Sequence, residues 1–457
     1  MGPGIKVSAN QFTREPSAQD EPVRILILGS GGREHALYRK IAASPRAEKI
    51  FVWPGNGLVP AADRVERPAV SDSFENLLEF IRTEKIDMTV VGNETPLVNG
   101  VRDFLKSHLP GHLVFGPDRL GAQLEGSKAF SDNFMAEAGI PHGTSVICDS
   151  LESALNALPA QELPIVLKAD GLAAGKGVSI HSDFESARAR LSEIFEGKIF
   201  GASGSRVLLQ KFLKGTEASL FALCNGSDAL LLPVARDYKR AKTGDEGENT
   251  GGMGAYCPGD NLSDAQKDFV RTRIIEPVLK KFRYRGLLYV GLMIASERAD
   301  DIAIVEFNCR FGDPETQSIL PLIEGDLLEY LMWTDDGVAQ EFPLVKNGSS
   351  TIVPYRRGAV VNVVISAKGY PGEFAKDIPL VFPDFKSTDL HVTGAGLKES
   401  AGRLLSTGGR IANVVAYGKT RAEARELAYA YLAEFSRHNA AAITQLYWRD
   451  DIALPAH

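Results

Sequence analysis

Short apolar runs alternate with amphipathic segments of helical period from residue 23 to about residue 122. The apolar runs lie at 23–28, 50–53, 88–91 and 113–115, and the helical segments lie at 32–44, 74–84 and 98–107. Nearly continuous apolar runs are typical of parallel strands that are buried on both faces. Their alternation with helices predicts an α/β domain with a doubly wound parallel sheet over residues 23–122.

The pattern changes between residue 123 and about residue 350. A helix predicted from Ser127 ends at Gly139, and Pro141 just beyond it is a stop signal. The small group of strands with a helix over about 142–216 predicts a mobile lid. Longer strands that predict a larger antiparallel sheet lie near 219–224, 229–235, 287–296 and 302–309.

The two ends of the chain differ from this middle part. Strands at 359–366 and 410–417, and a helix that opens with a capping-box signature at Thr420, predict a small mixed α/β domain over 355–457. Residues 1–22 are polar, contain three prolines and lack the apolar stretch of a secretory signal, so we expect a disordered extension. The chain is therefore predicted to be a multidomain protein of the α/β and α+β classes.

Composition agrees with this division and disfavours several classes of protein. The 457 residues are enough for about three domains, and 44% of them are hydrophobic. A net charge of −7 argues against non-specific nucleic-acid binding, and no run approaches the roughly 18–20 apolar residues of a membrane span. The four cysteines are far apart and form no CxxC pair, which indicates a reducing compartment, so we expect a cytoplasmic protein.

The first glycine-rich turn joins the first predicted strand to the first helix. Gly31 and Gly32 would let backbone N–H groups approach an anion at the N-terminus of that helix, and Arg33 follows directly. A dinucleotide fold is disfavoured, because Glu34 takes the place of the third glycine and the second strand ends at Trp53-Pro54 without an acidic residue. The turn alone is compatible with a phosphate-ester site and with a simple tight turn.

The second glycine-rich turn, Gly171–Gly177, lies between two predicted strands. It is not a Walker A loop, because three residues instead of four precede Gly-Lys and Gly177 replaces the hydroxyl residue. A flexible hairpin that closes over a triphosphate fits this composition, and a plain hairpin is the alternative. Lys168 ends the preceding apolar strand, where it either points into a phosphate site or extends to solvent.

Polar residues follow one another along the strand predicted at 302–310. Side chains alternate along a strand, so Glu306, Asn308 and Arg310 are expected on one face and Val305 on the other. The first two offer hard oxygen ligands for Mg²⁺, and the arginine can hold a carboxylate or phosphate in a bidentate fork. An exposed strand face with solvated charges is the alternative.

Two further segments carry an unusual density of charge. The residues after the strand include Asp313 and Glu315. The segment 236–256 contains Asp237 and Lys239 and then a glycine-rich stretch. A loop of this length inside a compact domain is usually functional or disordered. Its mixed charges favour an ordered substrate loop.

These features together resemble the phosphoribosylamine–glycine ligase family of the ATP-grasp superfamily. The matching segments are Gly31–Ala36, Leu124–Lys128, Lys168–Gly177, Asn249–Tyr256 and Glu306–Gln317. The stretch Asn-Cys-Arg-Phe-Gly-Asp-Pro-Glu-Thr-Gln in the last of them is the most specific. The resemblance covers about residues 23–440, with the motifs in the family's order.

The resemblance implies a fold and a reaction. The fold is a Rossmann-like N-terminal substrate domain, an ATP-grasp domain over 123–350 with its lid, and a small C-terminal domain. In the reaction, ATP phosphorylates glycine to glycyl phosphate, and 5-phosphoribosylamine displaces phosphate to form glycinamide ribonucleotide in de novo purine synthesis. Mg²⁺ or Mn²⁺ and cationic side chains would stabilise the developing charge.

The resemblance also implies roles for individual residues. ATP contacts are expected at Lys128, Lys168, Gly171, Gly175, Lys176, Gly177, Gln210, Lys211, Phe212, Leu213 and Glu217. Metal ligands are expected at Glu306 and Asn308. Substrate contacts are expected at Gly31, Gly32, Arg33, Asp237, Lys239, Arg310, Asp313 and Glu315, and catalytic roles at Arg310, Asp237 and Lys168. Within these sets, Asp237 and Arg310 would hold the ammonium and carboxylate of glycine, and Gly31, Gly32 and Arg33 the phosphoribosyl group.

Two positions depart from the family's pattern. Gln210 stands where relatives usually carry glutamate, so backbone contacts to adenine are expected there. Gly291, on the neighbouring strand, stands where many ATP-grasp enzymes place another acidic ligand, so two protein ligands are expected for the metal ion.

Other functions share part of this pattern. Another ATP-grasp carboxylate–amine ligase would recognise phosphate and carboxylate in the same way. A non-catalytic ATP-binding protein would keep the lysines but could lose Glu306, Asn308 or Arg310, all of which are present. The expected partners are small molecules, namely ATP, glycine and 5-phosphoribosylamine, with no nucleic acid and no membrane, and the chain is expected to be a monomer.

Overall fold

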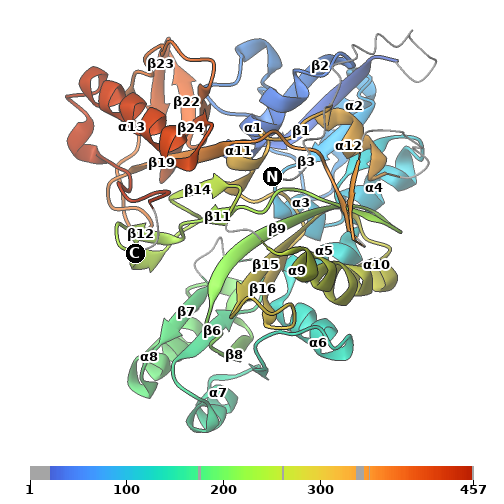
Figure 1. Ribbon diagram of the computed structural model, residues 1–457, viewed down its shortest axis with the longest axis vertical. Coiled ribbons are helices and arrows are strands. Elements are labelled where there is room, and N and C mark those ends of the chain that lie inside the picture. Colours follow the sequence, from blue (N-terminus) through green and yellow to red (C-terminus); the bar gives the residue numbers. More distant parts are fainter. Residues whose placement is uncertain (1–20, 173–176, 260–261, 336–343, 349, 455–457) are drawn as a thin grey trace, which may run out of the picture.

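The computed structural model describes residues 21–172, 177–259, 262–335, 344–348 and 350–454 (Figure 1). The first region is a parallel sheet with the strand order β2-β1-β3-β4. Its strands are β1 (Val23–Gly29), β2 (Ala47–Pro54), β3 (Met88–Val91) and β4 (Leu113–Phe115). Its helices are α1 (Gly32–Ile41), α2 (Glu75–Thr83), α3 (Glu94–Val98), α4 (Val101–His108) and α5 (Arg119–Gly126).

Helices cover both faces of this sheet, as the continuous apolar strands predicted. Ile25 and Ile27 of β1 belong to the hydrophobic cluster that includes α1, whereas Leu26 and Leu28 belong to the cluster that includes α2. The helix expected at 98–107 corresponds to α4, which begins three residues later, after a separate short helix, α3. Gly100 between them has a φ of +88°, which interrupts the α-helical backbone.

A smaller sheet projects from one end of the molecule (Figure 1). It is antiparallel, with the order β5-β8-β6-β7, and α7 (Leu151–Ala157) and α8 (Phe184–Phe195) pack on one face. Its strands are β5 (Ser145–Cys148), β6 (Ile165–Ala169), β7 (Val178–His181) and β8 (Val207–Lys211). α6 (Lys128–Glu137) precedes it and begins where the sequence predicted a helix, with Ser127 as its N-cap.

The larger sheet of the middle region has the order β16-β15-β9-β10-β18-β17. Its strands are β9 (Thr216–Asn225), β10 (Ala229–Leu231), β15 (Arg285–Ile294), β16 (Ile302–Asn308), β17 (Val345–Asn347) and β18 (Ser350–Ile352), and its helices are α9 (Asp264–Val270), α10 (Glu276–Phe282), α11 (Glu315–Ile319) and α12 (Leu327–Trp333). The sheet is mixed, not antiparallel throughout, because β18 runs parallel to β10. The strand expected to reach residue 235 ends at Leu231, two residues before Pro233.

A third sheet joins the middle of the chain to its C-terminal part. Its order is β11-β14-β19-β24-β21, so two strands from the middle region share a sheet with strands that follow residue 358, through the pairing of β14 with β19. The strands are β11 (Arg236–Asp237), β14 (Gly254–Cys257), β19 (Ala359–Ala367), β21 (Leu390–Gly394) and β24 (Arg410–Gly418). α13 (Arg421–His438) packs against it, and Thr420 caps this helix as predicted.

The segment 236–256, expected to be a loop, is largely paired. Its ends form β11 and β14, and its middle is a hairpin of β12 (Arg240–Lys242) and β13 (Glu246–Asn249). Its partner β19 lies about a hundred residues further along the chain, so a local pattern could not reveal this pairing. No helix among the described residues is both long and apolar enough to cross a membrane.

Candidate active site

β16 carries a β-bulge at Val305, in the middle of the strand. Gly291 of β15 pairs with Glu306 and Leu292 pairs with Ile304, which leaves Val305 without a partner residue in the ladder. The backbone oxygen of Val305 instead accepts a hydrogen bond of 2.8 Å from Lys168 Nζ. The bulge therefore connects the strand of the small sheet that carries Lys168 with the strand that carries Glu306.

The bulge also changes the expected alternation of side chains. Glu306 and Asn308 lie on one face as predicted, and the Asn308 amide donates to Glu306 Oε1 at 3.4 Å. Phe307 lies on the opposite face with Ile304 in an apolar core. Val305 is half-buried and does not belong to that core, contrary to the strict alternation assumed from the sequence. The extra residue at the bulge is the reason.

Three ammonium groups act on the carboxylate of Glu306. Lys239 Nζ lies 4.0 Å from Glu306 Oε1, and Lys168 and Lys128 are close enough to act electrostatically. Burial alone would raise the pKa of Glu306, but the three lysines outweigh it and lower the pKa. Burial also lowers the pKa of Lys168 to about 8, although Glu306 opposes this shift.

The donor set at Glu306 and Asn308 fits a hard divalent cation. The surrounding lysines keep the Glu306 carboxylate ionised, as a metal ligand must be. Gly291 lies opposite Glu306 and adds no oxygen, and a Cβ there would lie 3.3 Å from Glu306 Cγ. Over the described residues no cluster of three or more His, Cys, Asp or Glu forms a metal site by itself. Phosphate oxygens and water would have to complete the coordination.

Lys128 lies at the N-terminus of α6, next to the second glycine-rich turn. Its Nζ donates to the backbone oxygen of Gly171 at 2.9 Å, and burial lowers its pKa. The carboxylate of Asp170 accepts hydrogen bonds from the Ser127 hydroxyl and the Ala129 N–H at this same helix end. Gly177 returns the chain to β7 and accepts from Ala169 N at 2.8 Å. Gly175 and Lys176, both expected at the phosphates, lie outside the described residues.

One face of the small sheet is polar at one end and apolar beside it. Lys168 pairs with Val178 and Leu208, and two residues away Val166 pairs with Ile180 and Gln210. Ile180 is 42% exposed, so apolar surface lies open next to the lysine. The Gln210 side chain forms hydrogen bonds within the protein, because its amide donates to Gly143 O and Ser145 Oγ.

The next residues expected at adenine differ in their exposure. Lys211 forms an exposed ion pair with Glu162, so only its backbone remains near the apolar face. Phe212 and Leu213 are half-buried in the connection from β8 to β9. Glu217, at the start of β9, pairs with Lys239 at 3.4 Å.

Asp237 lies on β11, close to these charged groups. Burial raises its pKa to about 7, with Glu315 and Glu217 adding to the shift and Lys239 opposing it. A carboxyl group of this kind becomes fully ionised when a cation approaches. The arrangement is suited to a small ligand that carries an ammonium group.

Arg310 is held by two acids of the N-terminal region. Its Nε lies 3.2 Å from Glu94 Oε2, and its Nη2 lies 2.7 Å from Glu125 Oε1 and 3.3 Å from Asn308 Oδ1. Burial alone would lower the pKa of Arg310, but Glu125 and Glu94 outweigh it and raise the pKa. The ion pairs of Arg310 are thus with Glu94 and Glu125, neither of which was among the expected site residues.

The first glycine-rich turn faces the segment after β16. A Cβ on Gly32 would lie 2.4 Å from Gln317 Nε2 and 2.3 Å from Asn413 Nδ2, so only glycine allows this approach. The Gly31 N–H donates to the Glu34 carboxylate at 2.6 Å, which also pairs with Arg33. This N–H, expected to face an anion, is therefore occupied by an internal carboxylate.

Side chains from the C-terminal part reach the same place. Arg410 Nη1 donates to the backbone oxygens of Gly251 and Asp313, both at 2.6 Å. The Tyr370 hydroxyl accepts from the Gly251 N–H at 3.0 Å. The Asp313 carboxylate also accepts from Gln317 at 2.8 Å, and Arg410 and Arg33 outweigh burial to lower its pKa.

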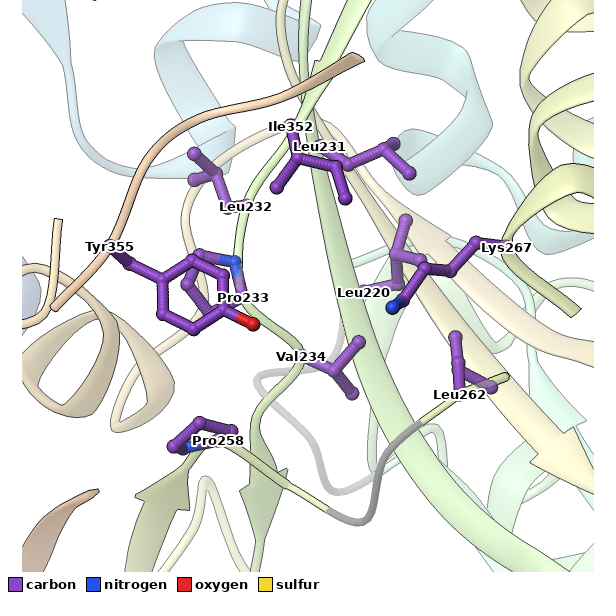
Figure 2. Close-up of a pocket in the computed structure, with 10 residues that line it drawn as sticks. All are labelled: Leu220, Leu231, Leu232, Pro233, Val234, Pro258, Leu262, Lys267, Ile352 and Tyr355. Atoms are coloured by element: carbon purple, nitrogen blue, oxygen red, sulfur yellow. The ribbon is translucent and has the colours of Figure 1, made fainter. Parts of the chain in front are cut away.

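Several contributing residues escaped sequence reasoning. Glu94, Glu125 and Arg410 stand in segments without a distinctive local signal, although Glu125 falls inside one of the matching motifs. A separate pocket lies elsewhere and is lined mostly by apolar residues, among them Leu220, Leu231, Val234 and Tyr355 (Figure 2). Leu220 alternates with Ser219, which pairs with Gly291 beside Glu306, so this pocket lies on the opposite face of the large sheet.

Comparisons with known proteins agree over nearly the whole chain. Family models match residues 23–125 (phosphoribosylglycinamide synthetase, N domain), 126–316 (the same enzyme, ATP-grasp (A) domain) and 360–455 (its C domain). A phosphoribosylamine–glycine ligase of Leptospira interrogans is 41% identical over 421 residues, which are 90% of this chain and 95% of that protein.

Solved structures give the same result. The crystal structure of a phosphoribosylamine–glycine ligase from Thermotoga maritima has a TM-score of 0.75 and 31% identity, covering 94% of this chain and 100% of that one. The biotin carboxylase domain of a Hydrogenobacter thermophilus 2-oxoglutarate carboxylase, solved with MgADP and bicarbonate, has a TM-score of 0.70 over 90% of each chain. At 14% identity the second likeness concerns the fold alone.

Proposed function

Because the chain belongs to the phosphoribosylamine–glycine ligase family, we propose that it joins glycine to 5-phosphoribosylamine, with conversion of ATP to ADP and phosphate. The product is glycinamide ribonucleotide, an intermediate of purine synthesis. The observation that carries this proposal is the line of Glu306, Asn308 and Arg310 facing Lys128, Lys168 and Lys239. It brings ligands for metal, phosphate and carboxylate to one place.

The ATP site lies between the small sheet and β16. Lys128 and Lys168 contact the phosphates, with Gly171 and Gly177 at the base of the turn over them. Adenine lies against the apolar face near Ile180 and takes hydrogen bonds from the backbone of residues 210–213, and Glu217 contacts the ribose. Mg²⁺ held by Glu306 and Asn308 would neutralise phosphate charge and orient the γ-phosphate for transfer.

Glycine lies between Arg310 and Asp237. Its carboxylate contacts the guanidinium beside the γ-phosphate, and its ammonium ionises Asp237, whose pKa of about 7 in the free protein makes it responsive to a cation. A carboxylate oxygen attacks the γ-phosphorus, the bond to ADP breaks, and glycyl phosphate forms. Lys239 and Lys168 stabilise the charge on the transferred group.

The second half-reaction uses the side of the site next to α1. The phosphoribosyl group lies between the Gly31–Arg33 turn and the segment that carries Asp313 and Glu315. The amine nitrogen attacks the carbonyl carbon of glycyl phosphate, loses a proton, and the C–O bond to phosphate breaks. No covalent enzyme nucleophile is needed for this sequence.

The proposal extends to organisation along the chain. We assign residues 23–122 to the substrate domain, 123–350 to the ATP-grasp domain with a lid over about 142–216, and 355–457 to the C-terminal domain. The strand pairing of β14 with β19 means that the last two share a sheet. The monomeric state and the cytoplasmic location stay predictions from the sequence.

ADP and phosphate release with a panel of amino acids, with and without freshly prepared 5-phosphoribosylamine, tests this function. We expect turnover to require glycine and the amine together. Turnover with a different acid or amine would instead identify another ATP-grasp ligase. ATP binding without turnover under any combination would identify a non-catalytic ATP-binding protein.

Closure of the lid has a direct signature in hydrogen exchange. We expect backbone amides of residues 168–172 and 177–180 to exchange more slowly with ATP and Mg²⁺ than without, because the turn closes over the phosphates. Amides of α13 serve as the internal control and should not change. Equal protection of the turn in both conditions would indicate a static hairpin.

The pKa of Lys168 predicts how ATP affinity depends on pH. The free protein carries this lysine protonated at neutral pH and loses the proton as pH rises through about 8. At about pH 9 only about a tenth remains protonated, so we expect ATP to bind up to about tenfold more weakly than at pH 7. Lys168→Arg, titrated calorimetrically in parallel, should remove most of this dependence. An identical pH dependence in both proteins would exclude Lys168 as its source.

A further inference from the structure

The carboxylate of Glu125 contacts two consecutive residues, Cys309 and Arg310. Glu125 Oε1 lies 2.7 Å from Arg310 Nη2. Its other oxygen, Oε2, accepts from the Cys309 N–H at 2.8 Å and from the Cys309 thiol at 3.1 Å. The same group therefore fixes the backbone before Arg310 and the guanidinium of Arg310 itself.

The second acid on Arg310 differs in kind. Glu94 makes one contact of 3.2 Å with this arginine, and its side chain is 26% exposed. The Glu125 side chain is 8% exposed and uses both oxygens. Hydrogen bonds of a buried carboxylate to donors on two neighbouring residues determine orientation more firmly than a single contact from a more exposed carboxylate.

Glu125 is also close in the chain to a residue at the phosphate side of the site. It lies in the last turn of α5, three residues before Lys128, which contacts Gly171 at the phosphate side of the site. Ser127 between them caps α6. One short segment of the N-terminal half thus contacts both the arginine and the glycine-rich turn.

We infer that Glu125 is the positioning residue that sets Arg310 for the carboxylate substrate, an inference that rests on the proposed function. It acts through Arg310 and does not itself touch the substrate. The distance over which the carboxylate and the γ-phosphate react leaves little tolerance for displacement of the guanidinium. Burial raises the pKa of Glu125 although Arg310 opposes the shift, so the two side chains depend on each other for their charge.

Glu125→Gln is the direct test. The amide keeps one oxygen but presents an N–H group to either Arg310 or Cys309. The contact with one of these two residues is therefore lost. We expect the KM for glycine to rise by about tenfold to a hundredfold, with the KM for ATP changed by less than about twofold. Glu125→Asp keeps the charge, but its side chain is too short to contact both residues. It should show a smaller rise in the KM for glycine. If Glu125→Gln does not fold, this variant tests the inference.

Asp335→Asn provides the matched control. Asp335 is a buried carboxylate that also holds an arginine, Arg102, and a backbone N–H, that of Val114, but it lies outside the site. We expect this variant to melt at a lower temperature with its kinetic constants unchanged. An unchanged KM for glycine in both Glu125 variants, or a parallel change in all constants, would overturn the inference.

The assignment of glycine is checked separately in the same series. The wild-type enzyme must show glycine-dependent ADP formation, and if it uses another acid the proposed function fails. The KM for that acid then replaces the KM for glycine in the comparison. Failure of the positioning role and failure of the proposed function are thereby distinguishable.

Discussion

Replacing Glu306 with alanine is expected to lower kcat by about a thousandfold. The variant loses the ionised oxygen ligand that the three lysines maintain at the end of β16. Its far-ultraviolet circular dichroism should match that of the wild type, because the backbone pairing of β15 and β16 does not depend on this side chain. Its melting temperature should fall slightly at neutral pH, since Lys128, Lys168 and Lys239 lose a counter-charge.

Asp301→Ala is a suitable control for this experiment. Asp301 lies just before β16 on an exposed hairpin, where it accepts from Ser296 and has no contact with the site residues. Its removal should leave turnover unchanged. Near-normal turnover of Glu306→Ala at saturating Mg²⁺ would contradict the assignment of Glu306 as a metal ligand.

Arg310→Lys is expected to raise the KM for glycine by about a hundredfold, with a lower kcat and a nearly unchanged KM for ATP. Lysine keeps the positive charge but loses the planar fork. It also cannot reproduce the separate contacts of Nε with Glu94 and of Nη2 with Glu125. Glycine offers only a carboxylate and an ammonium group, so a displaced cation affects it more than it affects ATP.

A purely structural role of Arg310 predicts a different result. Loss of the two ion pairs would then lower the melting temperature and shift all kinetic constants together. Arg102→Lys supplies the reference for that outcome, because Arg102 is a buried arginine paired with Asp335 away from the site. Steady-state kinetics with each substrate varied, together with melting curves of both variants, separates the two roles. A defect selective for ATP would contradict the placement of glycine.

The fold was predictable from the sequence wherever one local pattern determined it. The continuous apolar residues of β1 indicated burial on both faces, and Ser127 and Thr420 marked helix starts correctly. The failures have specific causes. Gly100, with its positive φ, separates α3 from α4 and so moves the helix start to Val101. β14 pairs with a strand far along the chain, which no local pattern records.

Sequence reasoning likewise found only the part of the site that has a local pattern. The strand that carries Glu306 and Asn308 could be found from alternation, because both residues lie within a few positions of each other. The partners of Arg310 could not, because Glu94 stands 216 positions away and its contact with Arg310 depends on the packing of α3 on α5 and of α5 against β16. The bulge at Val305 depends on the register of β16 with β15, and no local sequence pattern indicated it.

The pairing of β14 with β19 has a consequence for how the chain is made. Gly254–Cys257 leaves the ribosome before its partner Val360–Val363, which follows about a hundred residues later. At ordinary rates of translation this strand waits on the order of 5–20 s. During that interval the edge that will pair with β19 is open to other strands. Nascent chains stalled before residue 359 should therefore be the forms that most need a chaperone, whereas full-length chains can complete the sheet by themselves.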